Sequence, residues 1–201
     1  MAAGYVAGSM PFGYWLVRLA RGEDIRAHGS GNIGATNVWR VHGWRYGAPV
    51  VVLDVAKGFV PAFLGAQLVS PLVGVLAGAA AMLGHWRPLF LGFAKGGKIV
   101  ATGGGVFWAL APVVATAGLA IWALVFLATR YVSVASITAA LLMPLVALLL
   151  ERPWPVVAFA AATGVAVVLL HRPNIARLRA GTENRATLRR RRGGRDAAAR
   201  V

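Results

Sequence analysis

The stretch that decides the fold class is residues 99–129, IVATGGGVFWALAPVVATAGLAIWALVFLAT, which contains no charged residue. A helix that crosses a membrane needs about 20 predominantly apolar residues, so these 31 residues are too many for one crossing. Pro112 lies near the middle, and a proline inside a helix removes a hydrogen bond and clashes with the preceding turn. The stretch therefore favours a tight hairpin of two membrane helices over one long kinked helix.

The composition of the whole chain also indicates a membrane protein. Of its 201 residues 58% are hydrophobic and only 13% are charged, against about a quarter in a typical soluble domain. The mean hydropathy is +0.67. Cysteine is absent, which excludes disulfides and thiolate ligands or nucleophiles. The four histidines form no HExxH motif and the carboxylates do not cluster, so we expect neither a metal nor another cofactor.

Apolar runs predict seven helices, at residues 2–20, 46–69, 71–85, 99–111, 112–129, 133–151 and 154–170. Cytoplasmic loops of membrane proteins carry an excess of Lys and Arg. With seven crossings, almost all basic residues fall on one face, and Arg152 is the only one in the links of the other face. We therefore expect an all-α integral membrane protein with seven transmembrane helices in one bundle, its N-terminus outside and its C-terminus cytoplasmic.

The chain ends in a strongly basic segment. Residues 172–200 hold ten arginines, including the run RRRRGGR at 189–195, against two acidic residues. Such a segment beside a membrane domain is attracted to anionic lipid headgroups, by about 1 kcal/mol per basic residue. Nucleic-acid binding is the competing interpretation, which the adjoining membrane domain disfavours. We predict a membrane domain at 1–183 and a basic, disordered cytoplasmic tail at 184–201.

Three polar, Gly-rich stretches fall on the predicted cytoplasmic face, at residues 24–40, 84–98 and 171–183, and we expect them to meet in one site. The first contains GSGNIGATN at 29–37. Its glycines permit positive φ, and runs of their N–H groups can form an anion-binding nest. Arg40 follows, and guanidinium is a bidentate partner for phosphate. The competing interpretation is a flexible connector.

The second stretch places KGGK at 95–98 directly before an apolar helix. A helix N-terminus offers free N–H groups and the positive end of the dipole, which suit a phosphate. Lysines beside a span also arise from the positive-inside rule alone, and for Lys95 this alternative stays open. Gly103, Gly104 and Gly105 have a structural explanation, which is close packing between helices.

The third stretch begins where the last predicted span ends. His171, Asn174 and Arg177 or Leu178 share one face of a short helix, and Glu183 follows it. A single histidine at such a position is usually structural, but the asparagine one turn away favours a site.

Asp54 and Lys57 stand three residues apart inside the second predicted span. Charges within a membrane are costly and are usually paired, so we expect a structural ion pair. A wall of the site is the alternative. His85 is expected either to cap the third helix or to line the cleft.

At these stretches the sequence resembles the bacterial acyl-phosphate:glycerol-3-phosphate acyltransferase family (PlsY). GSMPFGYWLVR at 8–18 is similar to the family's first span, and GSGNIGATNVWR at 29–40 resembles its first motif. GHWRPLFLGFAKGGKIVAT at 84–102 resembles the second motif, and HRPNIARLRAGTE at 171–183 the third. LDVAKG at 53–58 and TRYVSVASI at 129–137 are also similar to family segments.

The second motif departs from the family pattern at two positions. The family commonly reads FKGGKGVAT, whereas here Ala94 intervenes after Phe93 and Ile99 replaces the last glycine. The backbone path around Lys98 is therefore the part of the motif that the resemblance predicts least.

The resemblance implies a metal-free, cofactor-free enzyme in the bacterial plasma membrane, with its active site on the cytoplasmic face. It would transfer a fatty acyl group from acyl phosphate to the 1-hydroxyl of glycerol 3-phosphate. The products would be lysophosphatidic acid and phosphate, in the first step of phospholipid biosynthesis. The partners would be these substrates and membrane lipid, with no nucleic acid.

The site residues follow from the residue types and the resemblance together. Those expected to carry the chemistry are Ser30, Arg40, Lys98, His171 and Asn174. Those expected to bind substrate are Gly31, Asn32, Gly34, Thr36, Asn37, Lys95, Gly96, Gly97, Thr102 and Glu183. The base is either His171 or a phosphate oxygen of a substrate, and the resemblance favours the phosphate.

A transporter or channel for a phosphorylated metabolite is the alternative function. A transport path needs polar residues at the membrane midplane or on both faces. Here the polar residues collect on one face and the links on the other face are minimal, so we favour the enzyme.

Overall fold

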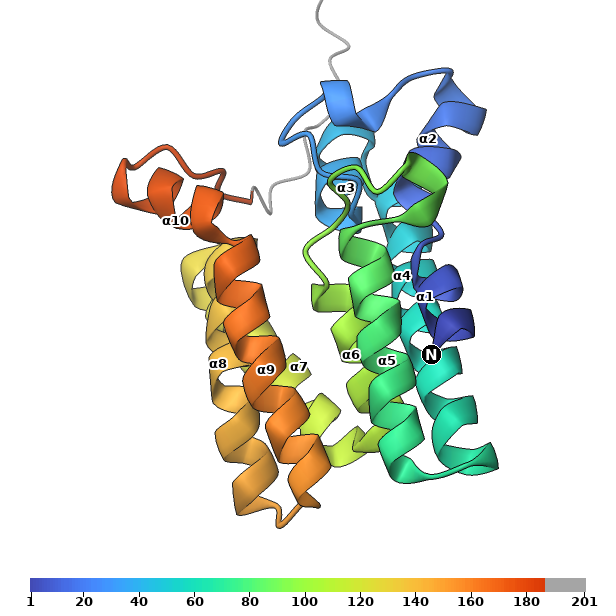
Figure 1. The fold of residues 1–201 in the computed structure, drawn as a ribbon. Helices are drawn as coiled ribbons and strands as arrows, with labels where there is room; N and C mark the ends of the chain where they lie inside the picture. The colour runs from blue at the N-terminus through green and yellow to red at the C-terminus, as the bar shows by residue number, and fades with distance from the viewer. Residues whose placement is uncertain (187–201) are drawn as a thin grey trace, which may run out of the picture.

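The computed structural model describes residues 1–186, and within this range its regular structure is entirely helical (Figure 1). The α-helices are α1 (Ala2–Gly8), α2 (Phe12–Arg21), α3 (Ala35–His42), α4 (Trp44–Leu68), α5 (Pro71–Trp86), α6 (Val100–Leu110), α7 (Pro112–Thr129), α8 (Val132–Leu149), α9 (Trp154–Leu170) and α10 (Arg172–Arg179). Short 3-10 helices, η1 (Ile25–Ala27) and η2 (Leu89–Leu91), lie in the loops. Helices α4 to α9 run along a common direction, whereas α2, α3 and α10 gather at one end (Figure 1).

The long helices form two groups. In the first, α4 packs against α5 and α6, and α1 lies against α5; in the second, α7, α8 and α9 pack in chain order (Figure 1). The groups are joined where α6 ends at Leu110 and α7 begins at Pro112, which confirms the predicted break between two helices. That both helices cross the membrane stays a prediction. Pro112 occupies the first turn of α7, where its missing N–H costs no helical hydrogen bond.

Helices α4 and α6 approach each other closely at two glycines. A Cβ on Gly58 would lie 2.1 Å from the Thr102 carbonyl oxygen, and one on Gly105 would lie 2.0 Å from the Val55 carbonyl oxygen. Small residues let membrane helices pack backbone to backbone. The predicted packing role is confirmed for Gly105.

The prediction of one continuous helix over residues 2–20 is wrong. Helix α1 ends at Gly8 and α2 begins at Phe12, with Pro11 between them as the N-cap of α2. Proline cannot donate the hydrogen bond that would continue the helix. The break leaves the Met10 carbonyl free, and the Lys57 ammonium donates to it at 2.8 Å. Helix α2 then lies at the polar end of the molecule (Figure 1).

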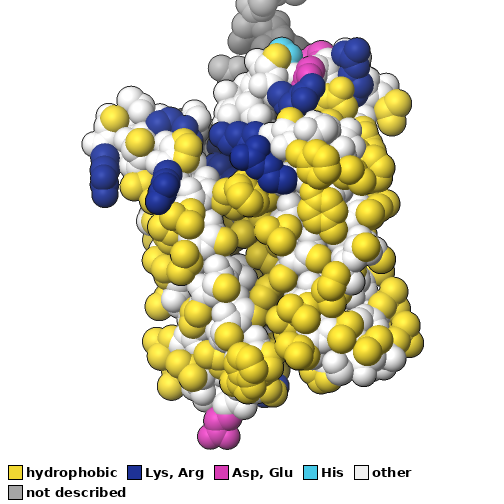
Figure 2. All heavy atoms as spheres, viewed as in Figure 1, with side chains coloured by type: hydrophobic (Ala, Val, Ile, Leu, Met, Phe, Trp, Pro, Cys, Tyr) yellow, Lys and Arg dark blue, Asp and Glu magenta, His cyan; other side chains and the backbone are white. Residues whose placement is uncertain are grey.

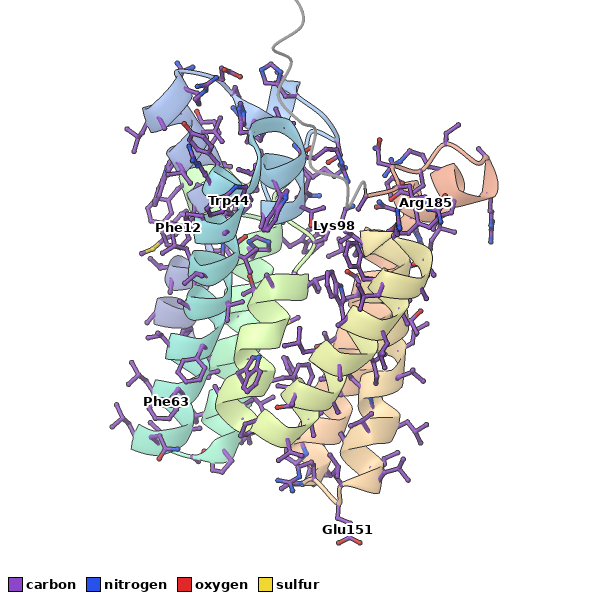
Figure 3. The ribbon with its side chains drawn as sticks, turned by 180° about the vertical axis from the view of Figure 1, so that it is seen from behind. Phe12, Trp44, Phe63, Lys98, Glu151 and Arg185 are labelled. Atoms are coloured by element: carbon purple, nitrogen blue, oxygen red, sulfur yellow. The ribbon has the colours of Figure 1, made fainter. Side chains whose placement is uncertain are left out.

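Three described helices, α4, α7 and α8, are long and apolar enough to cross a membrane, or four if the bent pair α9 and α10 counts as one span. The number of seven crossings and the orientation of the termini stay predictions. Figure 2 shows hydrophobic side chains covering the length of the bundle, with Lys and Arg gathered at the end that carries α2, α3 and α10. Glu151 marks the opposite end (Figure 3).

The predicted division of the chain at residue 183 stays a prediction. Residues 184–186 run back from α10 toward the bundle, and the Ala186 N–H donates to the Arg130 carbonyl at 2.9 Å. These residues also line the cavity described below. The rest of the predicted basic tail lies outside the described residues.

Asp54 and Lys57 form the expected ion pair inside the bundle. Their charged atoms are 2.7 Å apart, and each side chain is only 3% exposed. The His85 Nδ1 lies 3.8 Å from the same carboxylate. Asp54 and Lys57 therefore form a structural ion pair, and Asp54 is also part of the wall of the cavity.

We expect Lys57→Met to destabilise the fold strongly, because it leaves the Asp54 carboxylate buried without a partner. Removing one member of a buried pair costs about 3–5 kcal/mol. Thermal unfolding of the purified protein in detergent should show a large drop in Tm. The double variant Asp54→Asn/Lys57→Met, which buries no charge, should recover most of it.

Asp24→Asn is the matched control, since it removes a carboxylate from the exposed pair with Arg26. It should leave Tm nearly unchanged, as exposed pairs contribute little. A single Lys57→Met variant as stable as the parent would contradict the structural role of the pair.

Candidate active site

The three predicted polar loops meet at one cavity of about 1190 Å³ that opens at the polar end between the two helix groups. Lys98 lies at this end, between the groups, and Arg185 lies on the α10 side (Figure 3). The predicted site residues that line the cavity are Ser30, Asn32, Gly34, Thr36, Asn37, Arg40, Lys98, His171, Asn174 and Glu183. The expected convergence of the loops is therefore confirmed.

The first loop is organised around the buried Asn37 side chain. Its Oδ1 accepts from the Ser30 N–H at 2.8 Å. Its Nδ2 donates to the carbonyl oxygens of Asn32 at 2.9 Å and His28 at 3.0 Å, with Ile25 at 3.4 Å. The amide is thus committed to loop structure, which differs from the direct substrate contact expected for it.

The backbone N–H groups of this loop do not form the open nest that the sequence suggested. Those of Ser30, Gly31 and Gly34 all donate within the loop. Gly31 has φ +68°, so its place in the motif is explained by the turn. The first turn of α3 faces the cavity through Ala35 and Thr36, and the N–H groups of such a turn are able to bind an anion.

Arg40 extends from α3 into the same space. Within residues 1–186 its guanidinium makes no hydrogen bond or ion pair with another side chain. Its five N–H donors therefore face the cavity uncommitted, as expected of a phosphate ligand.

The second loop differs from expectation at its glycines. The Gly96 N–H donates to the Trp86 carbonyl and the Gly97 N–H to the His85 carbonyl, each at 2.9 Å. A Cβ on either residue would collide with His85, at 2.2 Å from its carbonyl or 1.8 Å from its ring. The two glycines are required for close packing on the end of α5, and neither offers a free N–H to substrate.

Two other predicted ligands of this region lie away from the cavity. Lys95 is exposed on the loop surface, in keeping with the positive-inside alternative. Thr102 is fully buried, and its carbonyl faces Gly58 of α4. By contrast, Gly103 and Gly104 both line the cavity. Gly103 also packs as predicted, since a Cβ there would lie 3.4 Å from the Met82 methyl group on α5, whereas one on Gly104 would meet nothing within 4 Å.

Ile99 holds the backbone in the left-handed region, with φ +61°, directly before α6. A β-branched residue in this conformation is strained, which explains why a glycine suits this position in related sequences. Ala94 is accommodated in the surface turn after Gly92, where its N–H donates to the Leu91 carbonyl at 3.2 Å. Both departures leave Lys98 facing the cavity.

A hydrogen-bonded relay connects Lys98 to three other elements. Its ammonium donates to Asn174 Oδ1, and Asn174 Nδ2 donates to Glu183 Oε1 at 2.6 Å. The same carboxylate accepts from Ser133 Oγ at 2.8 Å and from Arg177 Nε at 2.7 Å. Glu183 therefore fixes which way the Asn174 amide points. These contacts support the expected role of Glu183 in shaping the third loop. They also use both oxygens of its carboxylate.

Sequence reasoning missed Ser133 and the cavity-lining residues 184–186, and it left Arg177 as one of two options. Arg177 lines the cavity and binds Glu183. Ser133 belongs to the segment TRYVSVASI, whose resemblance to the family was the available signal. Its partner lies 50 residues away, so no local pattern reveals the contact.

Burial and like charges perturb the titration of two groups. Burial, then the nearby Arg177, lowers the pKa of Lys98 to about 8. Burial, then the Lys98 charge, lowers the pKa of His171 to about 4. The His171 Nδ1 lies 2.8 Å from the Val167 carbonyl, which can only accept, so Nδ1 carries the proton and Nε2 is the acceptor.

The fold and the cavity define the class: an integral membrane protein built of helices, with a cationic cavity at one end of its bundle. A sequence model of the glycerol-3-phosphate acyltransferase family matches residues 1–181. The chain belongs to this family. Its relatives include the glycerol-3-phosphate acyltransferase of Roseiflexus sp. (strain RS-1), which is 50% identical over 90% of this chain and 91% of the relative. The glycerol-3-phosphate acyltransferase of Desulforudis audaxviator (strain MP104C) is 46% identical over 92% of this chain and 93% of the relative.

Two solved structures share the fold. Both are crystal structures of PlsY (YgiH), an integral membrane glycerol 3-phosphate acyltransferase. The glycerol 3-phosphate form has a TM-score of 0.87 and 42% identity, covering 92% of each chain. The lysophosphatidic acid form has a TM-score of 0.85 and 40% identity, covering 92% of this chain and 93% of that one.

Anion binding should weaken as the pH rises through about 8, because Lys98 is charged below its lowered pKa and neutral above it. Calorimetric titration with glycerol 3-phosphate across this range should show the loss. A bound dianion favours the charged lysine, so the fall lies somewhat above the pKa of the free protein.

The control variant is Lys98→Arg, whose guanidinium stays charged throughout. It should bind with an affinity that no longer falls in this range. An equal fall in parent and variant would show that another group titrates.

Proposed function

We propose that the protein transfers a fatty acyl group from acyl phosphate to the 1-hydroxyl of glycerol 3-phosphate. The products are lysophosphatidic acid and phosphate, in the first step of phospholipid biosynthesis. The observation that carries the proposal is that one continuous cavity has a cationic end and an apolar arm between α6, α7 and α8. Such a cavity suits one substrate with a phosphate and a second with a phosphate and a fatty chain.

The charges of the polar end match two phosphates. Four basic residues line the same space: Arg40, Lys98, Arg177 and Arg185. Ser30, Arg40 and Lys98 bind and orient phosphate, while Asn32, His171 and Asn174 position glycerol 3-phosphate. The anions repel each other in water, so holding them together is the main part of the catalysis.

The reaction needs no covalent enzyme intermediate, because acyl phosphate is already an activated anhydride. The glycerol oxygen attacks the acyl carbon, the bond from that carbon to the phosphate oxygen breaks, and phosphate leaves with the electron pair. The hydroxyl proton passes to a phosphate oxygen. The low pKa of His171 makes its Nε2 a weak base, which supports this route over base catalysis by the ring.

The proposed location is the bacterial plasma membrane, with the cavity open to the cytoplasm. The positive-inside rule supports this orientation, because the basic residues gather at the end where the cavity opens (Figure 2). The basic tail then lies on the anionic headgroups of the same leaflet.

The experiment that tests the function measures phosphate release from purified protein in detergent, with palmitoyl phosphate and glycerol 3-phosphate. We expect release that depends on both substrates, with lysophosphatidic acid formed and no use of palmitoyl-CoA. Turnover without a membrane barrier would also exclude a transporter. Use of the CoA ester in place of acyl phosphate would overturn the proposed donor.

Arg40→Ala should lower kcat/KM in this assay by about tenfold to a hundredfold, the loss of a charge-assisted hydrogen bond. Arg45→Ala is its matched control, since Arg45 is exposed on the first turn of α4 and stacks on Trp44. It should keep nearly full activity.

His171→Ala separates the two possible roles of the histidine. A general base typically contributes a factor of about 10²–10⁴ to kcat. We expect instead a rise in KM for glycerol 3-phosphate with a much smaller change in kcat. A collapse of kcat at unchanged KM would identify the ring as the base.

A further inference from the structure

The apolar arm of the cavity has a definite depth. Its lining on α8 extends from Ser133, beside the polar end, to Met143. At a rise of 1.5 Å per residue this is roughly 15 Å. Half the hydrocarbon core of a bilayer is also roughly 15 Å thick. The arm is therefore about as deep as one leaflet, the depth that a single membrane acyl chain occupies.

The deepest part of the arm lies at a contact between α7 and α8, where Ala115, Gly118 and Met143 line it. A Cβ on Gly118 would lie 2.4 Å from the Met143 sulfur, so the methionine side chain rests on the bare backbone of that residue. Met143 is 7% exposed. Below it, Ala147 and Val114 are fully buried in the apolar core that joins the two helix groups. Along the axis of the bundle, this core closes the arm beyond Ala115 and Met143.

We propose that Met143, seated on Gly118, is the floor of the acyl-chain pocket and sets the longest chain that the enzyme accepts. This inference rests on the acyl transfer proposed above. A chain that reaches the floor gains about a factor of four in affinity for each buried methylene. A longer chain either displaces the Met143 side chain or leaves its extra carbons outside the arm. Methionine is flexible, so the limit is set by the volume available and not by a rigid wall.

A second apolar groove provides an internal control. It has a volume of about 350 Å³ and lies between α5 and α9, with Met82, Trp86 and Ile99 in its lining. Met82 is 5% exposed, close to the value for Met143. Truncating Met82 therefore makes a hole of the same size in the other groove. If the arm between α6 and α8 determines the preferred chain length, the hole left by Met82→Ala does not change that preference.

The experiment compares kcat/KM for myristoyl, palmitoyl, stearoyl and arachidoyl phosphate in the parent, Met143→Ala and Met82→Ala. Met143→Ala should raise the ratio of the longest to the preferred chain by roughly tenfold, since two more methylenes become buried. Met82→Ala should keep the parent ratio. An unchanged ratio in Met143→Ala, or an equal shift in Met82→Ala, would overturn the proposal.

Gly118→Ala tests the floor in the opposite direction. The added methyl pushes the flexible end of Met143 into the arm, so the optimum should move to shorter chains. A shift to longer chains would contradict the proposed contact.

A second measurement keeps the inference independent of turnover. If the parent uses no acyl phosphate, the proposed function has failed, and thermal stabilisation by alkyl phosphates of increasing length then tests the pocket alone. The chain length that stabilises best should lengthen in Met143→Ala and not in Met82→Ala. The same optimum in both variants would overturn the floor.

Discussion

Hydrocarbon offers no partner for a hydrogen bond or a charge, and this constraint decides where each polar group of the chain lies. The Lys57 ammonium inside α4 is held between the Asp54 carboxylate and the Met10 carbonyl. At the end of α9 the His171 ring is bonded to the Val167 carbonyl. Most Lys and Arg side chains of the described residues gather at one end (Figure 2), and the three polar loops, distant in sequence, share one cavity there.

The cavity end holds an excess of positive charge, and Glu183 is the carboxylate that organises it. Its oxygens accept from Ser133 on α8, from Asn174 and Arg177 on α10, and so tie the second helix group to the loop beyond it. Three donors to one carboxylate lower its pKa against the effect of burial. The carboxylate therefore stays charged at neutral pH, and Lys98 meets an amide oxygen instead of a competing anion.

The sequence predicts the long helices well, because apolar runs and prolines are local signals; the run at 154–170 matches α9 to the residue. The break at Pro11 was missed because the apolar run continues through it, and its stabilising contact comes from Lys57 on another helix. The convergence of the loops followed from charge asymmetry. The role of Gly96 and Gly97 could not be predicted from the sequence. An anion-binding nest and a close contact with His85 both require glycine at these positions.

The junction between the polar end and the apolar arm is where the proposed reaction has to occur. Lys98 lies just before α6 begins and His171 lies where α9 ends, so both mark the level at which the helices enter hydrocarbon. An acyl phosphate bound there keeps its chain at membrane depth while its phosphate meets the cations. The proposed donor then never has to leave the bilayer, and glycerol 3-phosphate enters the cavity from the water at its polar end. The acyl carbon, which joins the phosphate to the hydrocarbon chain, then lies at the boundary between the polar end of the cavity and its apolar arm.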